Sequence, residues 1–214
     1  DWDSATTVPS TSANLLPTLA IDKDDQLSAS GSASLNIGSG AVVAVVPVLT
    51  LNMATAHVVT GNTAITGLGT PAGTIDNAQV LSFTLSGASL FVGSGGALNA
   101  GRTAVETPAG AVGFSVSGAS FSMATVTTQS ATFTGVQASL TNASLSGVPS
   151  VDLQVSGSFK YNTSTGASGQ RIDWDSATTV PSTSANLLPT LAIDKDDQLS
   201  ASGSASLNIG SGAV

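Results

Sequence analysis

The stretch LSFTLSGASLFVGSGG, residues 81–96, decides the fold class. Apolar and polar residues alternate through it, and a Ser-Gly step, Ser86 and Gly87, interrupts the alternation near its middle. Period-two alternation of Leu, Phe, Val and Thr is typical of a β-strand with one buried face. The glycine of the step marks a bend, a bulge or a close approach of two backbones. We therefore predict a strand on each side of the step.

The same pattern, alternation interrupted by a Ser-Gly step, recurs along the chain. It is found in LSASGSASLNIGSG from Leu27, VGFSVSGASFSMAT from Val112 and VDLQVSGSFKYN from Val151, with glycines at Gly31, Gly118 and Gly157. No segment has a convincing helical period; the nearest, SANLLPTLAIDKDDQL from Ser12, is broken by Pro17. The sequence therefore predicts an all-β fold with strands of about four to seven residues and many turns.

Two all-β architectures compete. A β-sandwich fills its core with large side chains from two sheets, whereas a β-solenoid has a narrow core for which small residues suffice. Aromatic residues make up only 4% of this chain, and Ala, Ser, Gly and Thr dominate. We therefore expect an elongated parallel β-solenoid of about eight coils per repeat, with a β-sandwich repeat as the alternative.

A long internal repeat organises the chain. The 42 residues DWDSATTVPSTSANLLPTLAIDKDDQLSASGSASLNIGSGAV fill positions 1–42 and return without a change at 173–214, an offset of 172. Residues 1–172 are thus one complete unit, and 173–214 begin the next. We expect neighbouring repeats of the same chain to be the main partners, because they would cover strand edges that a single unit leaves unpaired.

Composition excludes several classes of partner. The net charge is −8 and only 8% of residues are charged, against about a quarter in soluble domains. Nucleic acid and anionic membrane surfaces require clustered Lys and Arg, which this chain lacks. The longest apolar run, residues 41–51, is broken by Pro47 and is shorter than the roughly 20 residues that span a bilayer. We expect no nucleic-acid binding and no membrane insertion.

The residues needed for catalysis are few. His57 is the only histidine, there is no cysteine, and neither a G-x-S-x-G nor a phosphate-loop pattern is found. We predict that the chain is not an enzyme and that it has no catalytic or cofactor-binding residues.

Calcium is the one chemical hypothesis that the sequence raises. Three carboxylates, Asp22, Asp24 and Asp25, surround Lys23, and the second copy repeats them as Asp194, Asp196 and Asp197. Hard cations take several oxygen ligands from carboxylates, carbonyls and water. An EF-hand starting at Asp22 would place Leu27 where that loop needs glycine. A metal site and a solvated acidic turn therefore both stay open.

The succession VGFSVSGASFSMATV, ATFTGVQASLTNASLSGVPSVDLQVSGSFKYN and IDWDSATTV resembles the long repeats of giant secreted or surface proteins of Gram-negative bacteria, of the adhesin-like and hemolysin-type calcium-binding kinds. The resemblance implies secretion, exposure at the bacterial cell surface, a role in adhesion or biofilm, and calcium. The nonapeptide calcium repeats of that family are absent here.

These observations predict a structural extender, or spacer, repeat of a very large extracellular adhesin-like protein that projects a binding domain from the cell surface. The alternative is a repeat that itself binds polysaccharide, another cell-surface ligand or partner repeats along one face. Buried Trp2 and Trp174 would favour the spacer. An exposed aromatic or polar groove at the same place in every unit would favour the binder, with Tyr161, Trp2 and Trp174 as the residues to inspect.

Overall fold

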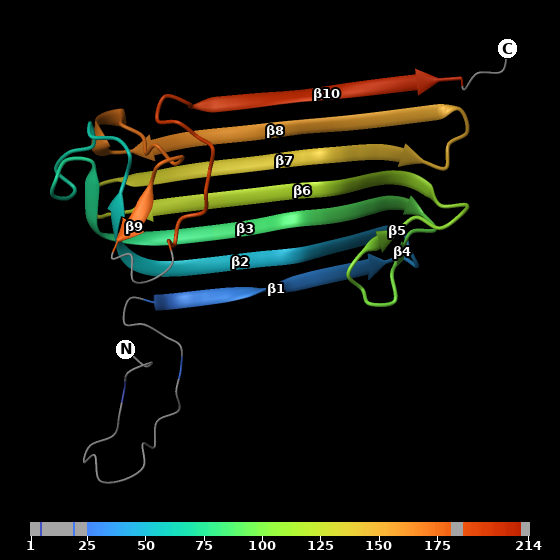
Figure 1. Cartoon of the computed structure of the whole chain (residues 1–214), viewed down its shortest axis with the longest axis horizontal. Helices are drawn as coiled ribbons and strands as arrows, with labels where there is room; N and C mark the ends of the chain where they lie inside the picture. The colour runs from blue at the N-terminus through green and yellow to red at the C-terminus, as the bar shows by residue number, and fades with distance from the viewer. Residues whose placement is uncertain (1–4, 6–18, 20–24, 181–185, 211–214) are drawn as a thin grey trace, which may run out of the picture.

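The computed structural model describes residues 5, 19, 25–180 and 186–210. They form one broad antiparallel sheet of long strands lying side by side (Figure 1). The main strands, in spatial order, are β1 (Asp25–Ile37), β2 (Val42–Val59), β3 (Thr74–Ser94), β6 (Val112–Thr127), β7 (Thr132–Ser146), β8 (Val151–Thr165) and β10 (Leu199–Ile209). The short β9 (Thr178–Val180) also pairs with β2. A two-stranded sheet, β4 (Ala97–Leu98) with β5 (Val105–Glu106), and a 3-10 turn, η1 (Ala167–Gly169), complete the described elements.

The predicted all-β class is confirmed, but the parallel arrangement is wrong. Every pair of neighbouring strands in the main sheet is antiparallel. The links 38–41, 128–131 and 147–150 contain four residues each, and such a link closes a hairpin, whereas parallel neighbours need a crossover of a dozen residues or more. The sheet is open, and the residues described include no second large sheet that would make a sandwich.

The strands are also far longer than predicted. Those from β1 to β8 in the main sheet have 13 to 21 residues. The reason is that the Ser-Gly steps lie inside strands rather than between them. Gly87 and Gly118 have φ values of 68° and 65°, and the β3–β6 register shifts between Leu85 and Leu90, a span that includes Gly87. A glycine in the left-handed region inserts an extra residue as a bulge, and the strand continues beyond it.

One face of the sheet, which we call the covered face, has a hydrophobic core at one end of the strands. Residues directly paired across strands share a face, and the row Asn162, Gly135, Ala124, Ser82 and Asn52 belongs to this one. The loop between β2 and β3, together with residues 172–177 and 187–193, supplies its cover. The largest members of the core are Val58, Ile65, Ile75, Val80, Val126, Phe133, Ile172, Trp174, Leu188, Leu191 and Ile193.

A smaller cluster lies at the other end of the strands. Val43, Phe91 and Ala111 are buried there beneath Leu98 and Val105 of the β4–β5 hairpin. Between the two clusters the covered face is polar. Hydroxyl pairs link neighbouring strands, as in Ser120–Ser139 at 2.7 Å and Ser158–Ser202 at 2.8 Å.

The opposite face, which we call the apolar face, has no such cover from the residues described. It includes Phe83 and Phe121, whose ring centroids are 6.0 Å apart in a tilted arrangement. Its most exposed large side chains are Leu27, Leu35, Ile37, Val92, Val112, Phe114, Phe159, Tyr161, Leu199, Leu207 and Ile209. Within the described part of the chain, no helix is long and apolar enough to cross a membrane.

The long strands of the two copies of the 42-residue repeat lie at opposite edges of the sheet, and the second copy also supplies the short β9 that pairs with β2. In the second copy, residues such as Trp174, Leu188 and Ile193 pack on the covered face, and Leu199–Ile209 form the outer strand β10. In the first copy, the corresponding residues 27–37 lie in β1, the outer strand at the other edge. The unit that packs together thus starts at β1 and is capped by the beginning of the next repeat.

Candidate functional site

The acidic cluster of the second copy forms a turn between the core segment and β10. The Asp194 carboxylate accepts a hydrogen bond from the Asp196 backbone N–H at 2.9 Å. The Asp197 carboxylate accepts one from the Asp194 N–H at 3.2 Å. Lys195 lies between its neighbours, with Nζ 3.6 Å from Asp194 Oδ1 and 3.3 Å from Asp196 Oδ2. This is an Asx-type turn closed by its own carboxylates.

Electrostatics within the turn agree with this geometry. The hydrogen bond from the Asp196 backbone, followed by the Lys195 ammonium, lowers the pKa of Asp194. The hydrogen bond to Asp196, followed by the charge of Asp194, raises the pKa of Lys195. A depressed carboxyl pKa stabilises the folded turn at pH values above the pKa that the group has in the unfolded chain. This contribution is lost as the pH falls through the pKa of the folded state. The turn is therefore held in its charged form at neutral pH.

The first copy of the cluster lies mostly outside the described residues. Asp22 and Asp24 fall there, and for Asp25 only the backbone, at the start of β1, is described. Among the residues that are described, no three His, Cys, Asp or Glu side chains are grouped closely enough to hold a metal ion. Calcium binding by Asp22, Asp24, Asp25, Asp194, Asp196 and Asp197 stays one of the two alternatives that the sequence raises, beside a solvated acidic turn.

We expect the melting midpoint of the 214-residue chain to be the same in EDTA and in millimolar calcium. The reason is that carboxylate oxygens of Asp194, Asp196 and Asp197 already contact Lys195 or backbone N–H groups. Differential scanning calorimetry measures the midpoint, with magnesium as the control for a general ionic effect. A midpoint that rises with calcium alone would show that a metal binds the folded state.

Trp174 of the second copy is the best-anchored side chain of the core. It is 2% exposed, and its indole Nε1–H donates to Asn162 Oδ1 at 2.9 Å. The indole lies directly on β7, because Gly135 has no side chain there: a Cβ at that position would lie 2.7 Å from the ring. Trp2, the same residue of the first copy, lies outside the described residues.

Asn162 connects the sheet to its cover. Besides accepting from Trp174, its Nδ2 donates to the carbonyl oxygens of Ile172 at 2.9 Å and Asp194 at 3.1 Å. It is fully buried. The Asn-Thr-Ser sequon that starts at Asn162 is therefore closed to glycosylation in the folded chain, a fact that the sequence pattern does not indicate.

His57 lies at the surface beside one carboxylate. Its Nδ1 is 2.5 Å from Asp76 Oδ1, and both side chains are partly exposed. The pair joins β2 to β3 near one end of the sheet.

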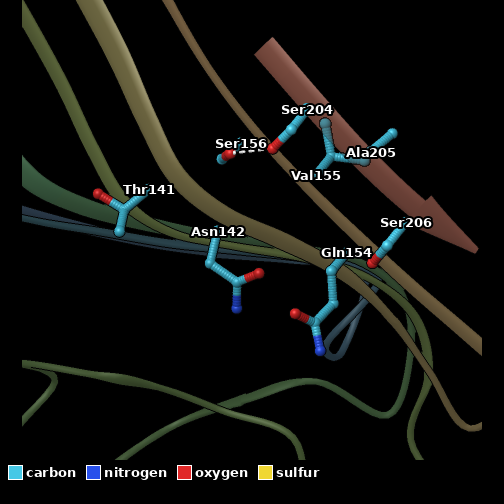
Figure 2. A pocket seen from close by; sticks show the side chains of 8 residues that line it. All are labelled: Thr141, Asn142, Gln154, Val155, Ser156, Ser204, Ala205 and Ser206. Carbon is cyan, nitrogen blue, oxygen red and sulfur yellow. Dashed lines mark hydrogen bonds between the residues drawn. The ribbon is translucent and has the colours of Figure 1, made fainter.

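A shallow polar hollow lies on the covered face where β7, β8 and β10 meet (Figure 2). It has a volume of about 190 Å³ and is lined mainly by side chains such as Asn142, Gln154 and Ser206. Ser156 and Ser204 hydrogen bond across it at 2.9 Å. No aromatic side chain lines the hollow, and Tyr161 belongs to the apolar face, because it pairs with Leu199.

The two outer strands of the sheet have the same sequence. Residues 27–37 of β1 and 199–209 of β10 have the same eleven letters, yet they lie at opposite edges of one sheet (Figure 1). Six antiparallel pairings separate them. Because each pairing reverses the direction, β1 and β10 run the same way.

The two strands also present the same residues to the same face. Leu27 pairs with Met53, and the row continues through Leu81, Thr125, Thr134 and Thr163. Thr163 lies two residues after Tyr161, so both share a face, and Tyr161 pairs with Leu199. The two equivalent leucines, Leu27 and Leu199, therefore both lie on the apolar face.

A consequence for hydrogen bonding follows. In a strand of L-residues, the face that a side chain takes fixes the edge toward which that residue's N–H and C=O point. The residues of β1 that bond to β2 therefore correspond to the residues of β10 that point away from β8. One strand of this sequence can pair on both edges without competition for any backbone group.

The sequence alone does not predict this arrangement, although the same eleven residues occur in both outer strands. The identity of 27–37 and 199–209 indicates a repeat, but only the number of intervening antiparallel strands shows that the two copies are equivalent edges. Comparisons of the chain with protein families, with curated proteins and with solved structures give no match.

Proposed function

We propose that this chain is an extender repeat of a very large extracellular adhesin-like protein of the bacterial cell surface, joined to its neighbours through shared strands. The single observation that supports it is the equivalence of β1 and β10. In a longer array, the strand that ends one unit would also begin the next, so that the sheet runs on without a break.

The sequence after β10 supports this continuation. Residues 210–213 repeat the Gly-Ser-Gly-Ala of 38–41, which links β1 to β2 as a hairpin. A chain that continued as the next repeat would therefore return along the free edge of β10 as a new β2. Its partners would be the neighbouring repeats, in agreement with the expectation from the sequence.

The reach of such an array follows from strand spacing. Each 172-residue period adds six long strands, β1, β2, β3, β6, β7 and β8. At about 4.8 Å between strands, one repeat extends the sheet by roughly 29 Å. Neighbouring repeats would be joined both by the polypeptide chain and by the hydrogen bonds of the shared strand. Such a double connection suits a spacer that holds a binding domain away from the cell.

The environment of the aromatic residues favours the spacer over the glycan-binding alternative. Trp174 is buried in the core, and the polar hollow has no aromatic side chain on which a sugar ring could stack. The proposal includes no catalytic role, because His57 contacts a single carboxylate at the surface.

The proposal is tested with chains of one, two and three units, each ending in the 42-residue tail. We expect the maximum dimension from small-angle X-ray scattering to grow by roughly 30 Å per added unit. We also expect the melting midpoint to rise with unit number, because each unit adds an interface. An increase of the maximum dimension far above roughly 30 Å per unit, with a constant melting midpoint, would indicate that the repeats fold independently and share no interface. Glycan-array binding by the isolated repeat would favour the alternative function.

A further inference from the structure

We infer that the apolar face is a self-association surface, on which a second copy of this chain packs its own apolar face. The inference concerns the face of the sheet, not its edges, so it does not depend on the shared-strand proposal. Its starting point is the contrast between the two faces of one sheet.

The covered face buries its apolar residues beneath loops, whereas the apolar face has no such cover from the part of the chain that the structure describes. Phe114, Phe159 and Tyr161 are 36%, 40% and 37% exposed, and Leu207 and Ile209 are exposed by more than half. They lie on β6, β8 and β10, and Leu145 of the intervening β7 pairs with Phe114 on the same face, so the residues form one continuous patch. Monomeric proteins rarely expose apolar patches beyond a few hundred Å².

Along β8, the charged side chains are placed on the other side. Asp152 and Lys160 alternate with Leu153 and Phe159 along β8, so their side chains point to the covered face. Across the central rows, the apolar face carries Leu, Val, Phe, Met, Ala and Thr, such as Leu51, Phe83, Met123 and Val136 in one row. The pair His57 and Asp76 lies near one end of the strands, outside these rows. Central rows without a charged side chain suit another apolar face better than they suit a charged partner.

The size of the face is sufficient for a stable dimer. Seven strands at about 4.8 Å and eleven residues at about 3.3 Å give a patch of roughly 30 by 35 Å, or about 1,000 Å² per copy. A standard stable interface buries about 800 Å² per partner. Two sheets pack face to face at about 10 Å, with side chains interdigitated, as in a β-sandwich.

A second copy of the chain is the occupant that the extent and chemistry of the face support. The patch extends over all seven main strands, and a second copy offers a sheet face of the same extent and chemistry. The contact would use the same surface on both partners and would therefore close at two chains. Pairing through the edges of β1 and β10 would instead be open-ended, so stoichiometry distinguishes the two modes.

Sedimentation equilibrium of the 214-residue chain tests the inference, with Phe159→Lys as the disrupting variant. We expect twice the mass of one 20.8 kDa chain for the wild type at micromolar concentration, and at least a 100-fold weaker association for the variant. Gln154→Lys, on the covered face of the same strand, is the matched control and should remain a dimer.

Oxidation of methionine provides a second readout that does not depend on the variant. The only two methionines, Met53 and Met123, lie on the apolar face. We expect peroxide to oxidise them several-fold faster in the dissociated chain, reached by dilution, than in the dimer. The inference would be overturned by a chain that stays monomeric at 100 µM. It would also be overturned by open-ended growth that Phe159→Lys leaves unchanged, or by association with lipid vesicles only. A Phe159→Lys chain that keeps its circular dichroism but stays dimeric would do the same.

Discussion

Replacing Trp174 by alanine is expected to lower the free energy of unfolding by about 3–5 kcal/mol, the usual cost of removing a large buried aromatic side chain. Trp174 is 2% exposed and fills the space above Gly135. Its loss would leave a cavity between the sheet and its cover, and Asn162 Oδ1 would lose its donor. Urea denaturation followed by circular dichroism measures the change.

The chain contains its own control for this substitution. Trp2 is followed by the same 40 residues as Trp174, but a chain that starts at Asp1 holds no earlier repeat for it to cover. We expect Trp2→Ala to change the free energy of unfolding by less than about 0.5 kcal/mol, the range of substitutions away from a core. Equal costs for the two substitutions would contradict the view that each repeat caps the one before it.

Replacing Asn162 by leucine is expected to cost about 3 kcal/mol or more. The leucine has a similar volume, but it would leave the indole N–H of Trp174 and the carbonyl oxygens of Ile172 and Asp194 without their partner. A buried polar group without a partner costs about 1–3 kcal/mol. The same urea denaturation measures this change.

Asn142 is the matched control, because it is the other sequon asparagine and is exposed. We expect Asn142→Leu to be nearly neutral. The double variant of Asn162 and Trp174 should lose less free energy of unfolding than the two single variants lose in sum, because the two residues share a hydrogen bond. A neutral Asn162→Leu would show that the connection between sheet and cover does not depend on this side chain.

The sequence predicted the class of fold and the positions of its irregularities, but not the arrangement of its strands. Alternation in 81–96 indicates a strand, and Gly87 is indeed a bulge. Period two is the same in parallel and antiparallel sheets, so it could not decide between a solenoid and the observed meander. The length of the links was the available signal, and the expectation of separate short strands on each side of every Ser-Gly step concealed it.

The placement of the candidate site shows a similar limit. The acid cluster is visible in the sequence, yet its closure by backbone N–H groups depends on the turn at Asp194. In the sequence, Asn162 stands out only as the asparagine of an Asn-Thr-Ser sequon, since its role as a buried connector depends on Trp174 and Asp194 reaching it from the next repeat. Contacts between repeats cannot be derived from the pattern within one of them.

Amide hydrogen exchange along β10 tests the shared strand. In the 214-residue chain, amides of residues 199–209 should alternate between slow exchange, where they face β8, and fast exchange, where they face the free edge. In a chain lengthened by one further 172-residue unit, we expect the second set to slow by at least about 100-fold, because a new β2 would accept their hydrogen bonds. Outward amides that exchange equally fast in both chains would contradict strand sharing between repeats.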